Sequence, residues 1–384
     1  MNRFIKVFQK SSVQSNNLSS GTFDVCLVGA GLAGCILADQ LSLKGYSVLV
    51  FDQVSQGEAS KVSSGLINPV TGLRFVKTWK FEELLETALQ YYRDLELRLV
   101  NDFINKAEIL VFLKEIEAEN NWLARAGDPL YSSFIGLEPF GKQLGDQLHL
   151  PLSLGRIRHV HKVDIPNVVR SLKKDLPARC NWIEAPFIYS LLETNGDLWK
   201  YEDRFIFRKV VFCEGYKLSE NPFFNWLPVH NLKGEFLKVK LSSRMPKEIL
   251  HSDYTVIPLD KQDYWVGSNY ELKNTTEKTT NEERLKQEEF IRRTVKSPFD
   301  VSEHGFGIRA ASRDRRPVVG EHPEYQNLFL INGLGTKGVT LAPYCAVQLL
   351  SLWAQGVKLP PEIDIKRFVK KGFYRMNETF DRSK

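Results

Sequence analysis

The segment Asp24–Gly34 (DVCLVGAGLAG) decides the fold, because an apolar run leads directly into three spaced glycines. The run 25–28 predicts a buried parallel strand, and apolar residues at helical spacing follow as far as Gly45. A second apolar run, Tyr46–Phe51 (YSVLVF), predicts another buried strand, with Asp52 at its end. The sequence therefore predicts a βαβ unit of about thirty residues.

The glycines of this unit predict a nucleotide site. Gly29, Gly31 and Gly34 form a G-x-G-x-x-G pattern, which permits a tight turn, close approach of the backbone to a pyrophosphate, and close contact between helix and strand. The helix N-terminus would offer free N–H groups to the phosphates. We expect Asp52 to accept hydrogen bonds from ribose hydroxyls, which argues against a 2′-phosphate. A tight turn that binds no ligand is the alternative.

Composition and charge are those of an ordinary globular protein. Of the 384 residues, 43% are apolar and 26% are charged, which excludes a disordered or collagen-like chain. The length suggests two domains. The formal charge of +6 is mild for this length, so it favours an anionic ligand without by itself indicating a nucleic-acid-binding protein.

The cysteines and histidines predict neither a disulfide scaffold nor a metal site. The five cysteines are odd in number and include no C-x-x-C pair, so we expect reduced, mostly buried thiols. No histidines stand at metal-ligand spacing, and we assign no metal. Gly338–Val357 is uncharged and long enough to cross a bilayer, but Pro343 and several polar residues favour a core helix. We therefore expect no membrane span.

Residues 1–23 form a leader that we expect to be flexible. The leader carries Arg3, Lys6 and Lys10, and no acid precedes Asp24. This composition is similar to that of an organellar transit peptide, and a leader without any function is the alternative. We expect a cytoplasmic protein, with organellar import through this leader as the other reading.

Beyond the βαβ unit, the pattern of the chain changes twice. Residues 56–71 are small, polar and glycine-rich and predict a loop, and a long amphipathic helix begins at Phe81. Residues 227–269 alternate in polarity, which predicts half-buried antiparallel strands. The apolar run Asn327–Asn332 predicts a last buried strand, followed by a glycine loop and a helix that begins near Val339.

Several of these segments resemble one known family. Gly57–Ser60 and Ser64–Pro69 resemble the loop that lies against the flavin ring in the D-amino-acid oxidase, glycine oxidase and sarcosine oxidase family. Gly307–Gly320 resembles the late signature of that family, and Asn327–Pro343 resembles its final flavin-binding strand, loop and helix. Weaker matches are Lys209–Gly215 and Val229–Val239, so the resemblance extends over most of residues 24–357.

The resemblance implies FAD as the cofactor. No histidine stands before Gly65, where some relatives attach their flavin, so we expect non-covalent FAD. The helix after Gly338 would direct its positive N-terminal end at the flavin and stabilise the reduced state. Lys337 would add a positive charge or else be solvated. The cofactor-binding residues that this predicts are Gly29, Gly31, Gly34, Asp52, Ser60, Ser64, Gly65, Gly215, Gly333, Gly335, Thr336, Lys337, Gly338 and Val339.

The resemblance also implies a carboxylate anchor. It places Arg309 where the family grips the substrate carboxylate through a bidentate pair, and a structural ion pair is the alternative role. In the family a tyrosine hydroxyl from the sheet of the substrate domain joins this site, and Tyr254 is the candidate for it. Its distance in sequence to Pro258 differs by one residue from the glycine oxidase spacing. Competing aromatics are Tyr264, Trp265 and Tyr270, whose default role is core packing. Arg313, Arg315 and Arg316 are expected on the surface, in salt bridges or at phosphates.

Together these features predict two domains. An α/β, Rossmann-like FAD-binding domain would comprise residues 24–105, 156–220 and 305–384. An α+β substrate domain built on an antiparallel sheet would comprise 106–155 and 221–304. The implied function is oxidation of the C–N bond of an amino acid or N-substituted glycine to an imine. The partners would be a small carboxylated amine and oxygen or another electron acceptor.

Two other functions stay open. The C-terminal half also resembles the FAD domain of the bifunctional tRNA wobble-uridine modification enzyme, especially at Ser312–Gly320 and Gly335–Cys345. That domain oxidises a carboxymethylaminomethyl group, so tRNA is the alternative partner, although this chain shows no fused methyltransferase segment. A binding protein that keeps the nucleotide fold without turnover is the third hypothesis. The sequence does not specify the substrate, the electron acceptor or the oligomeric state.

Overall fold

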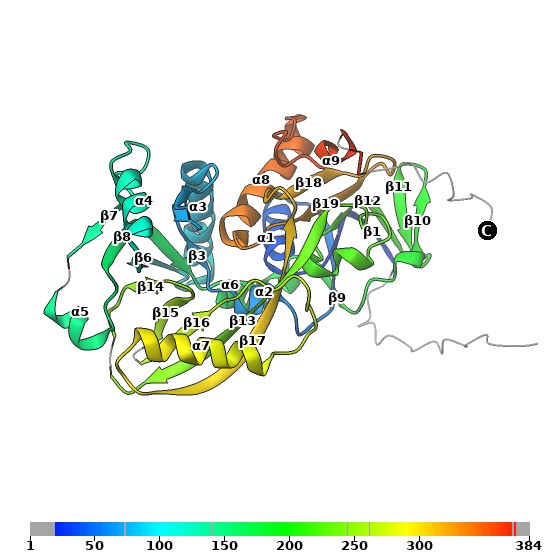
Figure 1. Ribbon diagram of the computed structural model, residues 1–384. Helices are drawn as coiled ribbons and strands as arrows, with labels where there is room; N and C mark the ends of the chain where they lie inside the picture. Colours follow the sequence, from blue (N-terminus) through cyan, green and yellow to red (C-terminus); the bar gives the residue numbers. More distant parts are fainter. Residues whose placement is uncertain are drawn as a thin grey trace, which may run out of the picture.

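The computed structural model describes residues 20–373 except 73, 140, 244, 261 and 371. Residues 1–19 of the leader predicted for 1–23 therefore lie outside the described residues. The two large sheets of the described structure occupy separate regions of the molecule (Figure 1), and β4 (Val70–Thr71) and β5 (Val76–Lys77) form a small third sheet. None of the helices in the described part of the chain combines the length and the apolar character that a membrane span requires.

The first sheet is built around the predicted βαβ unit. Its parallel strands lie in the order β19-β12-β1-β2-β9, and the shorter strands β10, β11 and β18 pair antiparallel with their neighbours. The strands are β1 (Gly21–Val28), β2 (Val48–Asp52), β9 (Asn181–Glu184), β10 (Leu192–Asn195), β11 (Leu198–Tyr201), β12 (Phe205–Phe212), β18 (Val318–Glu321) and β19 (Leu328–Asn332).

Alternation along β1 supplies both faces of this sheet. Val25 and Leu27 pack in a core with helices, whereas Cys26 and Val28 pack on the other face in an aromatic-rich core. The helices on the first face are α1 (Leu32–Leu43), α3 (Phe81–Leu99), α6 (Ile165–Asp175) and α8 (Gly338–Gln355). Burial on both faces explains why the strand sequences are continuously apolar.

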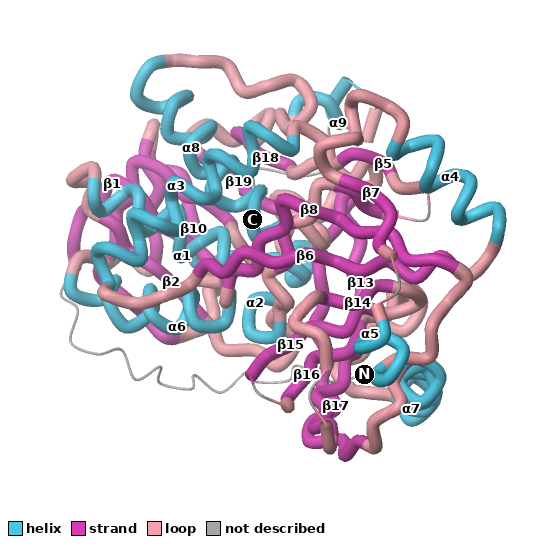
Figure 2. Tube along the Cα trace, turned by 90° about the vertical axis from the view of Figure 1, so that its left-hand side faces the viewer, coloured by secondary structure: helices cyan, strands magenta, loops and turns pink. Residues whose placement is uncertain are grey.

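The second sheet is mostly antiparallel, in the order β17-β13-β16-β15-β14-β6-β8-β3, with β7 beside β8 (Figure 2). Its strands are β3 (Leu66–Ile67), β6 (Ile104–Leu113), β7 (Ile135–Glu138), β8 (Ser153–Val163), β13 (Val229–Leu241), β14 (Ile249–His251), β15 (Thr255–Asp260), β16 (Asp263–Gly267) and β17 (Phe299–Ser312). The remaining strands and α-helices are β4 (Val70–Thr71), β5 (Val76–Lys77), α2 (Ala59–Val62), α4 (Ile116–Ala126), α5 (Lys142–Gln147), α7 (Asn281–Thr294) and α9 (Lys366–Lys370). Short 3-10 helices are η1 (Leu176–Ala178), η2 (Tyr189–Leu191) and η3 (Gly215–Glu220).

The two long strands β13 and β17 matter most for the site. They pair over their whole common length, and Gly234 lies opposite Gly307 while Leu232 lies opposite Arg309. On its other edge β13 pairs with β16, where Phe236 lies opposite Gly267. The middle strand β13 therefore brings the end of β16 and the second half of β17 to either side of Gly234.

Several predictions about elements are confirmed. All five cysteines are free and buried. The uncharged segment that begins at Gly338 forms α8, a helix with a long buried face that includes Leu341, Tyr344 and Leu349. The predicted amphipathic helix from Phe81 is α3, and the alternating segment 227–269 contains β13 to β16.

Four predicted boundaries fall inside strands of the structure. The first strand begins at Gly21, within the expected leader, and its Phe23 is buried against Phe205 and Phe207. The boundaries at 105/106, 155/156 and 304/305 fall inside β6, β8 and β17, which belong to the second sheet. These three strands are long because each pairs with a long antiparallel partner, which the local pattern did not reveal.

Candidate active site

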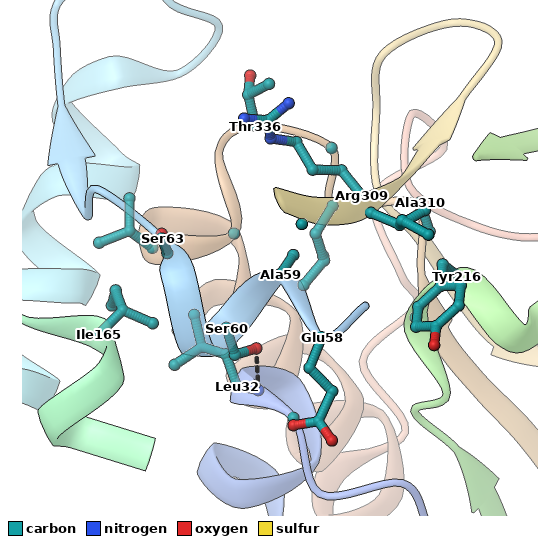
Figure 3. A pocket seen from close by; sticks show the side chains of 18 of the residues that line it. Leu32, Glu58, Ala59, Ser60, Ser63, Ile165, Tyr216, Arg309, Ala310 and Thr336 are labelled. Atoms are coloured by element: carbon teal, nitrogen blue, oxygen red, sulfur yellow. Dashed lines mark hydrogen bonds between the residues drawn. The ribbon is translucent and has the colours of Figure 1, made fainter. Parts of the chain in front are cut away.

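A cavity of about 510 Å³ lies between the two sheets and is lined by segments far apart in the sequence. The segments include the glycine turn before α1, the loop around α2, the end of β12, part of β17 and the loop before α8 (Figure 3). Every cofactor-binding residue that the sequence predicts lines this cavity, except Gly34, Gly65 and Gly333. Arg309 and Tyr254, the two predicted substrate residues, line it too.

The three glycines of the first turn have different roles. Gly29 has a φ of +93°, and a Cβ there would lie 2.7 Å from the Cys213 carbonyl oxygen. A Cβ on Gly34 would lie 1.9 Å from the Gly29 carbonyl oxygen, so α1 could not pack this closely against the turn that follows β1. A Cβ on Gly31 would meet only the Ser60 hydroxyl, at 3.4 Å. Gly29 and Gly34 are thus required by the fold, whereas Gly31 keeps the cavity side of the turn open.

The N-terminus of α1 faces the cavity. Gly31 precedes the helix and supplies no side-chain cap, so its first N–H groups depend on other partners. The Leu32 N–H donates to Ser60 Oγ at 3.0 Å (Figure 3). Ser60 therefore holds the loop around α2 against this helix end, where backbone donors and the helix dipole favour an anion.

Asp52 is held at the end of β2 by two partners. Its Oδ1 accepts from the Ala30 N–H at 2.9 Å, and its Oδ2 pairs with Lys173 Nζ at 2.6 Å. Each carboxylate oxygen can accept more than one hydrogen bond, so a ribose hydroxyl could still be accommodated. Lys173 comes from α6 and was missed, because nothing in its local sequence distinguishes it from Lys174.

The loop between α2 and β3 depends on Gly65. Its φ is +63°, and a Cβ there would lie 1.7 Å from the Val163 carbonyl oxygen. Its own carbonyl accepts from the Val163 N–H at 2.9 Å. The close approach of these two backbones positions the preceding Ser64 at the cavity.

The loop before α8 crosses the cavity as predicted. Gly333 and Gly335 adopt φ angles of +70° and +54°, and the Asn332 side chain donates to the Gly215 carbonyl at 3.0 Å. This contact joins the ends of β19 and β12 at the same edge of the sheet. Thr336, Gly338 and Val339 continue the lining at the N-terminus of α8.

Lys337 lies inside the cavity and is not a solvated side chain. Its Nζ lies 3.2 Å from Thr78 Oγ1 and 3.5 Å from Thr71 Oγ1. Burial, together with the nearby charges of Arg316 and Arg315, lowers the pKa of Lys337 to about 8. The lysine would therefore hold a positive charge near neutral pH in a place that favours a negatively charged ligand.

Arg309 has room because Gly234, two residues along β13 from its direct partner Leu232, has no side chain. A Cβ on Gly234 would lie 2.5 Å from Arg309 Nη1. Nη2 donates to Ser268 Oγ at 2.5 Å, and the guanidinium carbon lies 5.7 Å from the centre of the Tyr270 ring. Nη1 is buried and has no hydrogen-bond partner among the described residues. Burial lowers the pKa of Arg309, because the buried cation lacks a carboxylate partner in the described structure.

Tyr254 lines the cavity, but its hydroxyl is already bonded within the protein. Its hydroxyl donates to Glu283 Oε1 of α7 at 2.8 Å. Burial is the main cause that raises the pKa of Tyr254, and the hydrogen bond to Glu283 raises it further. The aromatic that lies over Arg309 is Tyr270, one of the competing candidates. A signal for Tyr270 was present in the sequence, since it stands in the polar segment 268–274 directly after a predicted strand.

Glu214 and Glu58 are acids of the cavity that the sequence did not reveal. Glu214 stands two residues after the end of β12 and accepts from the Tyr189 hydroxyl and from Asn221 Nδ2, the latter at 2.7 Å. Burial raises the pKa of Glu214 to about 7, although both hydrogen bonds act to lower it. Glu58 Oε2 is buried without a partner among the described residues. Among the described residues, the cavity thus holds an unpaired hydrogen-bond acceptor, Glu58 Oε2, and an unpaired donor, Arg309 Nη1.

Comparison with known proteins identifies the family. Residues 24–352 match the family model described as DAO, FAD dependent oxidoreductase. The chain belongs to this family. FAD is therefore its cofactor, as predicted, and the open face at Gly31, beside the N-terminus of α1, fits the approach of its pyrophosphate. Its classification as an FAD-dependent oxidoreductase is confirmed as well.

The curated relatives include a bifunctional enzyme of tRNA modification. The tRNA 5-methylaminomethyl-2-thiouridine biosynthesis bifunctional protein MnmC of Legionella pneumophila (strain Corby) is 22% identical, covering 90% of this chain and 57% of its own length. MnmC of Idiomarina loihiensis is 23% identical, covering 84% of this chain and 54% of its own length. The chain spans little more than half the length of these relatives.

Solved structures show the same fold. Glycine oxidase from Geobacillus kaustophilus superposes with a TM-score of 0.75 and 17% identity, covering 86% of this chain and 94% of that chain. Iminodiacetate oxidase (IdaA) from Chelativorans sp. BNC1 superposes with a TM-score of 0.73 and 19% identity, covering 88% of this chain and 97% of that chain. At these identities the likeness shows the fold alone.

Proposed function

We propose that this chain oxidises the C–N bond of a small carboxylated amine, either an amino acid or an N-substituted glycine, to an imine. The observation that carries this proposal is Arg309, whose Nη1 is buried in the cavity without a partner among the described residues. A desolvated guanidinium is favourable only if its ligand brings a negative charge. A carboxylate matches the planar donor set of an arginine.

We assign the first sheet and its helices to FAD and the second sheet to the substrate. The phosphates would lie at Gly31 and the N-terminus of α1, and the ribose hydroxyls at Asp52. The flavin would lie along the loop 333–339 and the segment 64–65. This arrangement leaves the end of the cavity at Arg309, on β17 of the second sheet, for the substrate.

The residues of the chain would mainly bind and orient the substrate. Arg309 would fix the carboxylate, so that the adjacent C–H bond is held at a constant position relative to the cavity wall. Bound FAD supplies the two-electron acceptor for this oxidation. The substrate loses two electrons and two protons as the imine forms, and water then hydrolyses the imine. Oxygen or another acceptor would receive the electrons.

The structural comparisons support this substrate class. Two of the similar solved structures are a glycine oxidase and an iminodiacetate oxidase by their titles. Both of those names denote amines that carry a carboxylate. Their low identity means that the assignment to this chain depends on Arg309 and its surroundings.

An anaerobic screen tests the proposal. The purified flavoprotein is mixed with amino acids, N-methylglycines and iminodiacids, and the absorbance of oxidised flavin is followed. At least one carboxylated amine should bleach the flavin, whereas its decarboxylated counterpart should do so far more slowly. A protein that keeps its oxidised spectrum with every carboxylated amine would contradict the proposal and would favour a binding protein without turnover.

A second candidate is oxidation of a carboxymethylaminomethyl group on tRNA. It is favoured by the MnmC relatives and by a cluster of basic side chains around Trp79, the residue after the cavity residue Thr78. The Arg316 guanidinium carbon lies 4.8 Å from the Trp79 ring centre, and Lys80 lies on the same ring at 5.5 Å. Arg309 would hold the carboxylate of this substrate too. Tight tRNA binding that weakens steeply with salt would favour this function over the first.

A further inference from the structure

We propose that Ser268 is a second substrate-binding residue, which shares the substrate carboxylate with Arg309 and restricts the site to carboxylated amines. The inference rests on the proposed function and deepens it. Both residues line the same cavity, and they reach it from different strands of the second sheet.

The hydrogen bond between the two residues determines which donors stay free. Arg309 Nη2 donates to Ser268 Oγ, so the serine oxygen acts as an acceptor in this contact. Its own O–H must then point elsewhere, and among the described residues it meets no acceptor. Arg309 Nη1 likewise has no partner. The pair therefore presents two free donors, one from each residue, to the cavity.

Two adjacent donors match the two oxygens of a carboxylate. One oxygen would accept from Arg309 Nη1 and the other from the Ser268 hydroxyl, while Nη2 keeps its bond to Ser268. Two other partly buried arginines, Arg156 and Arg179, already have carboxylate partners. Arg156 pairs with Glu138, and Arg179 pairs with Asp39. Arg309 is instead bonded to a neutral hydroxyl, which leaves its charge for a ligand.

The sheet register fixes the positions of Ser268 and Arg309. Ser268 follows the end of β16. The next residue, Asn269, is fixed to β13 because its Oδ1 accepts a hydrogen bond from the Glu235 N–H at 2.7 Å. Gly234, in the strand between, leaves the space that the guanidinium occupies. Tyr270 covers the guanidinium on another side. Serine and arginine are thus held together before any substrate binds, which lowers the entropic cost of binding.

The test uses three variants of the holoenzyme. Ser268→Ala removes the hydroxyl, Ser268→Thr retains it, and Ser302→Ala is the control. Ser302 is an exposed serine of the same strand as Arg309, and its hydroxyl donates to the Lys238 carbonyl at 3.1 Å. The readouts are the Kd of acetate, followed by the change in flavin absorbance, the kcat and KM for a carboxylated amine, and the flavin content.

The expected pattern is specific to binding. Ser268→Ala should weaken acetate binding and raise KM by roughly 10- to 100-fold, as for a hydrogen bond to a charged group. Its flavin content should match the wild type, and its KM for a decarboxylated amine should change far less than its KM for the carboxylated amine. Ser268→Thr should recover most of the affinity, and Ser302→Ala should match the wild type.

The contradicting outcomes are distinguishable. If Ser268→Ala binds acetate as tightly as the wild type while Arg309→Met does not, Ser268 is not a binding residue and the proposed function stands. If Ser268→Ala loses flavin or slows both kinds of substrate equally, its role is structural and the inference is wrong. If acetate fails to bind even the wild type, both the inference and the carboxylate anchor fail.

Discussion

Lys173 Nζ lies 2.6 Å from Asp52 Oδ2, so a lysine of α6 is bonded to the carboxylate that ends β2. The other carboxylate oxygen accepts from the Ala30 N–H in the glycine turn. One buried acid therefore joins the turn before α1 to a helix 121 residues further along the chain. The edge of the sheet that we assign to FAD is held together by this acid.

Replacing Lys173 should weaken this edge. Lys173→Met leaves the Asp52 carboxylate buried with only the Ala30 N–H, and should lower the free energy of unfolding of the apoprotein by about 1–3 kcal/mol. Lys174→Met is the matched control, because Lys174 is the next residue on α6 and is exposed. Urea denaturation of the two variants measures the difference. Equal unfolding midpoints would show that the pair contributes nothing to stability.

Two glycines of the turn should separate folding from cofactor binding. Gly31→Val should leave the fold intact but lose FAD, because the new side chain projects from the open face where the pyrophosphate approaches. Gly34→Val should lower the free energy of unfolding by about 3 kcal/mol, because its Cβ meets a backbone oxygen. Flavin content and apoprotein stability are measured for both. A Gly31→Val protein that purifies with full FAD would refute the placement of the phosphates.

Glu214 should make the stability of the apoprotein depend on pH. Burial raises its pKa to about 7 in the folded state, from an ordinary value of 4.5, so the folded state binds the extra proton between these values. Stability should therefore fall as pH rises from 4.5 to 7, by up to about 3 kcal/mol, and then level off.

Glu214→Gln isolates this contribution, because the amide cannot ionise yet can still bond to Tyr189 and Asn221. The fall in unfolding free energy between pH 5 and pH 8 should be smaller in the variant than in the wild type. The charged carboxylate would also disfavour a nearby pyrophosphate, so wild-type FAD affinity should fall as pH rises through about 7, where the folded protein loses this proton. Identical pH profiles for the two proteins would contradict the assignment.

The sequence predicted those parts of the site that depend on local structure. The turn at Gly29–Gly34 and the loop before α8 can be recognised because strand, glycines and helix are consecutive. Arg309 was proposed through resemblance, since its signature lies in one short segment, and the structure places it at the cavity. In each of these cases the residues that make the site also make the local fold.

The contacts between distant segments could not be predicted in the same way. Ser268 and Arg309 meet because β13 lies between β16 and β17, and that register follows from the whole sheet. Tyr254 was selected by its position before a proline, but its hydroxyl bonds to Glu283 of a helix 29 residues away. The roles of Lys173 and Glu214 likewise depend on packing between α6, β2 and β12.

The most direct test of the proposed function is the kinetics of Arg309→Met on a matched pair of amines, with and without the carboxylate. Losing the guanidinium should raise KM for the carboxylated amine by several hundred-fold, as expected for one partner of a desolvated charge pair worth about 3–5 kcal/mol. Arg309→Lys should recover only part of this, because an ammonium lacks the two-pronged geometry.

The same measurement distinguishes an anchor from a structural ion pair. Because Arg309 has no carboxylate partner in the described structure, its replacement by methionine should leave flavin content and stability unchanged. If Arg309 anchors the carboxylate, KM rises for the carboxylated amine and stays near its wild-type value for the decarboxylated amine. Equal losses of kcat/KM for the two amines would contradict the account.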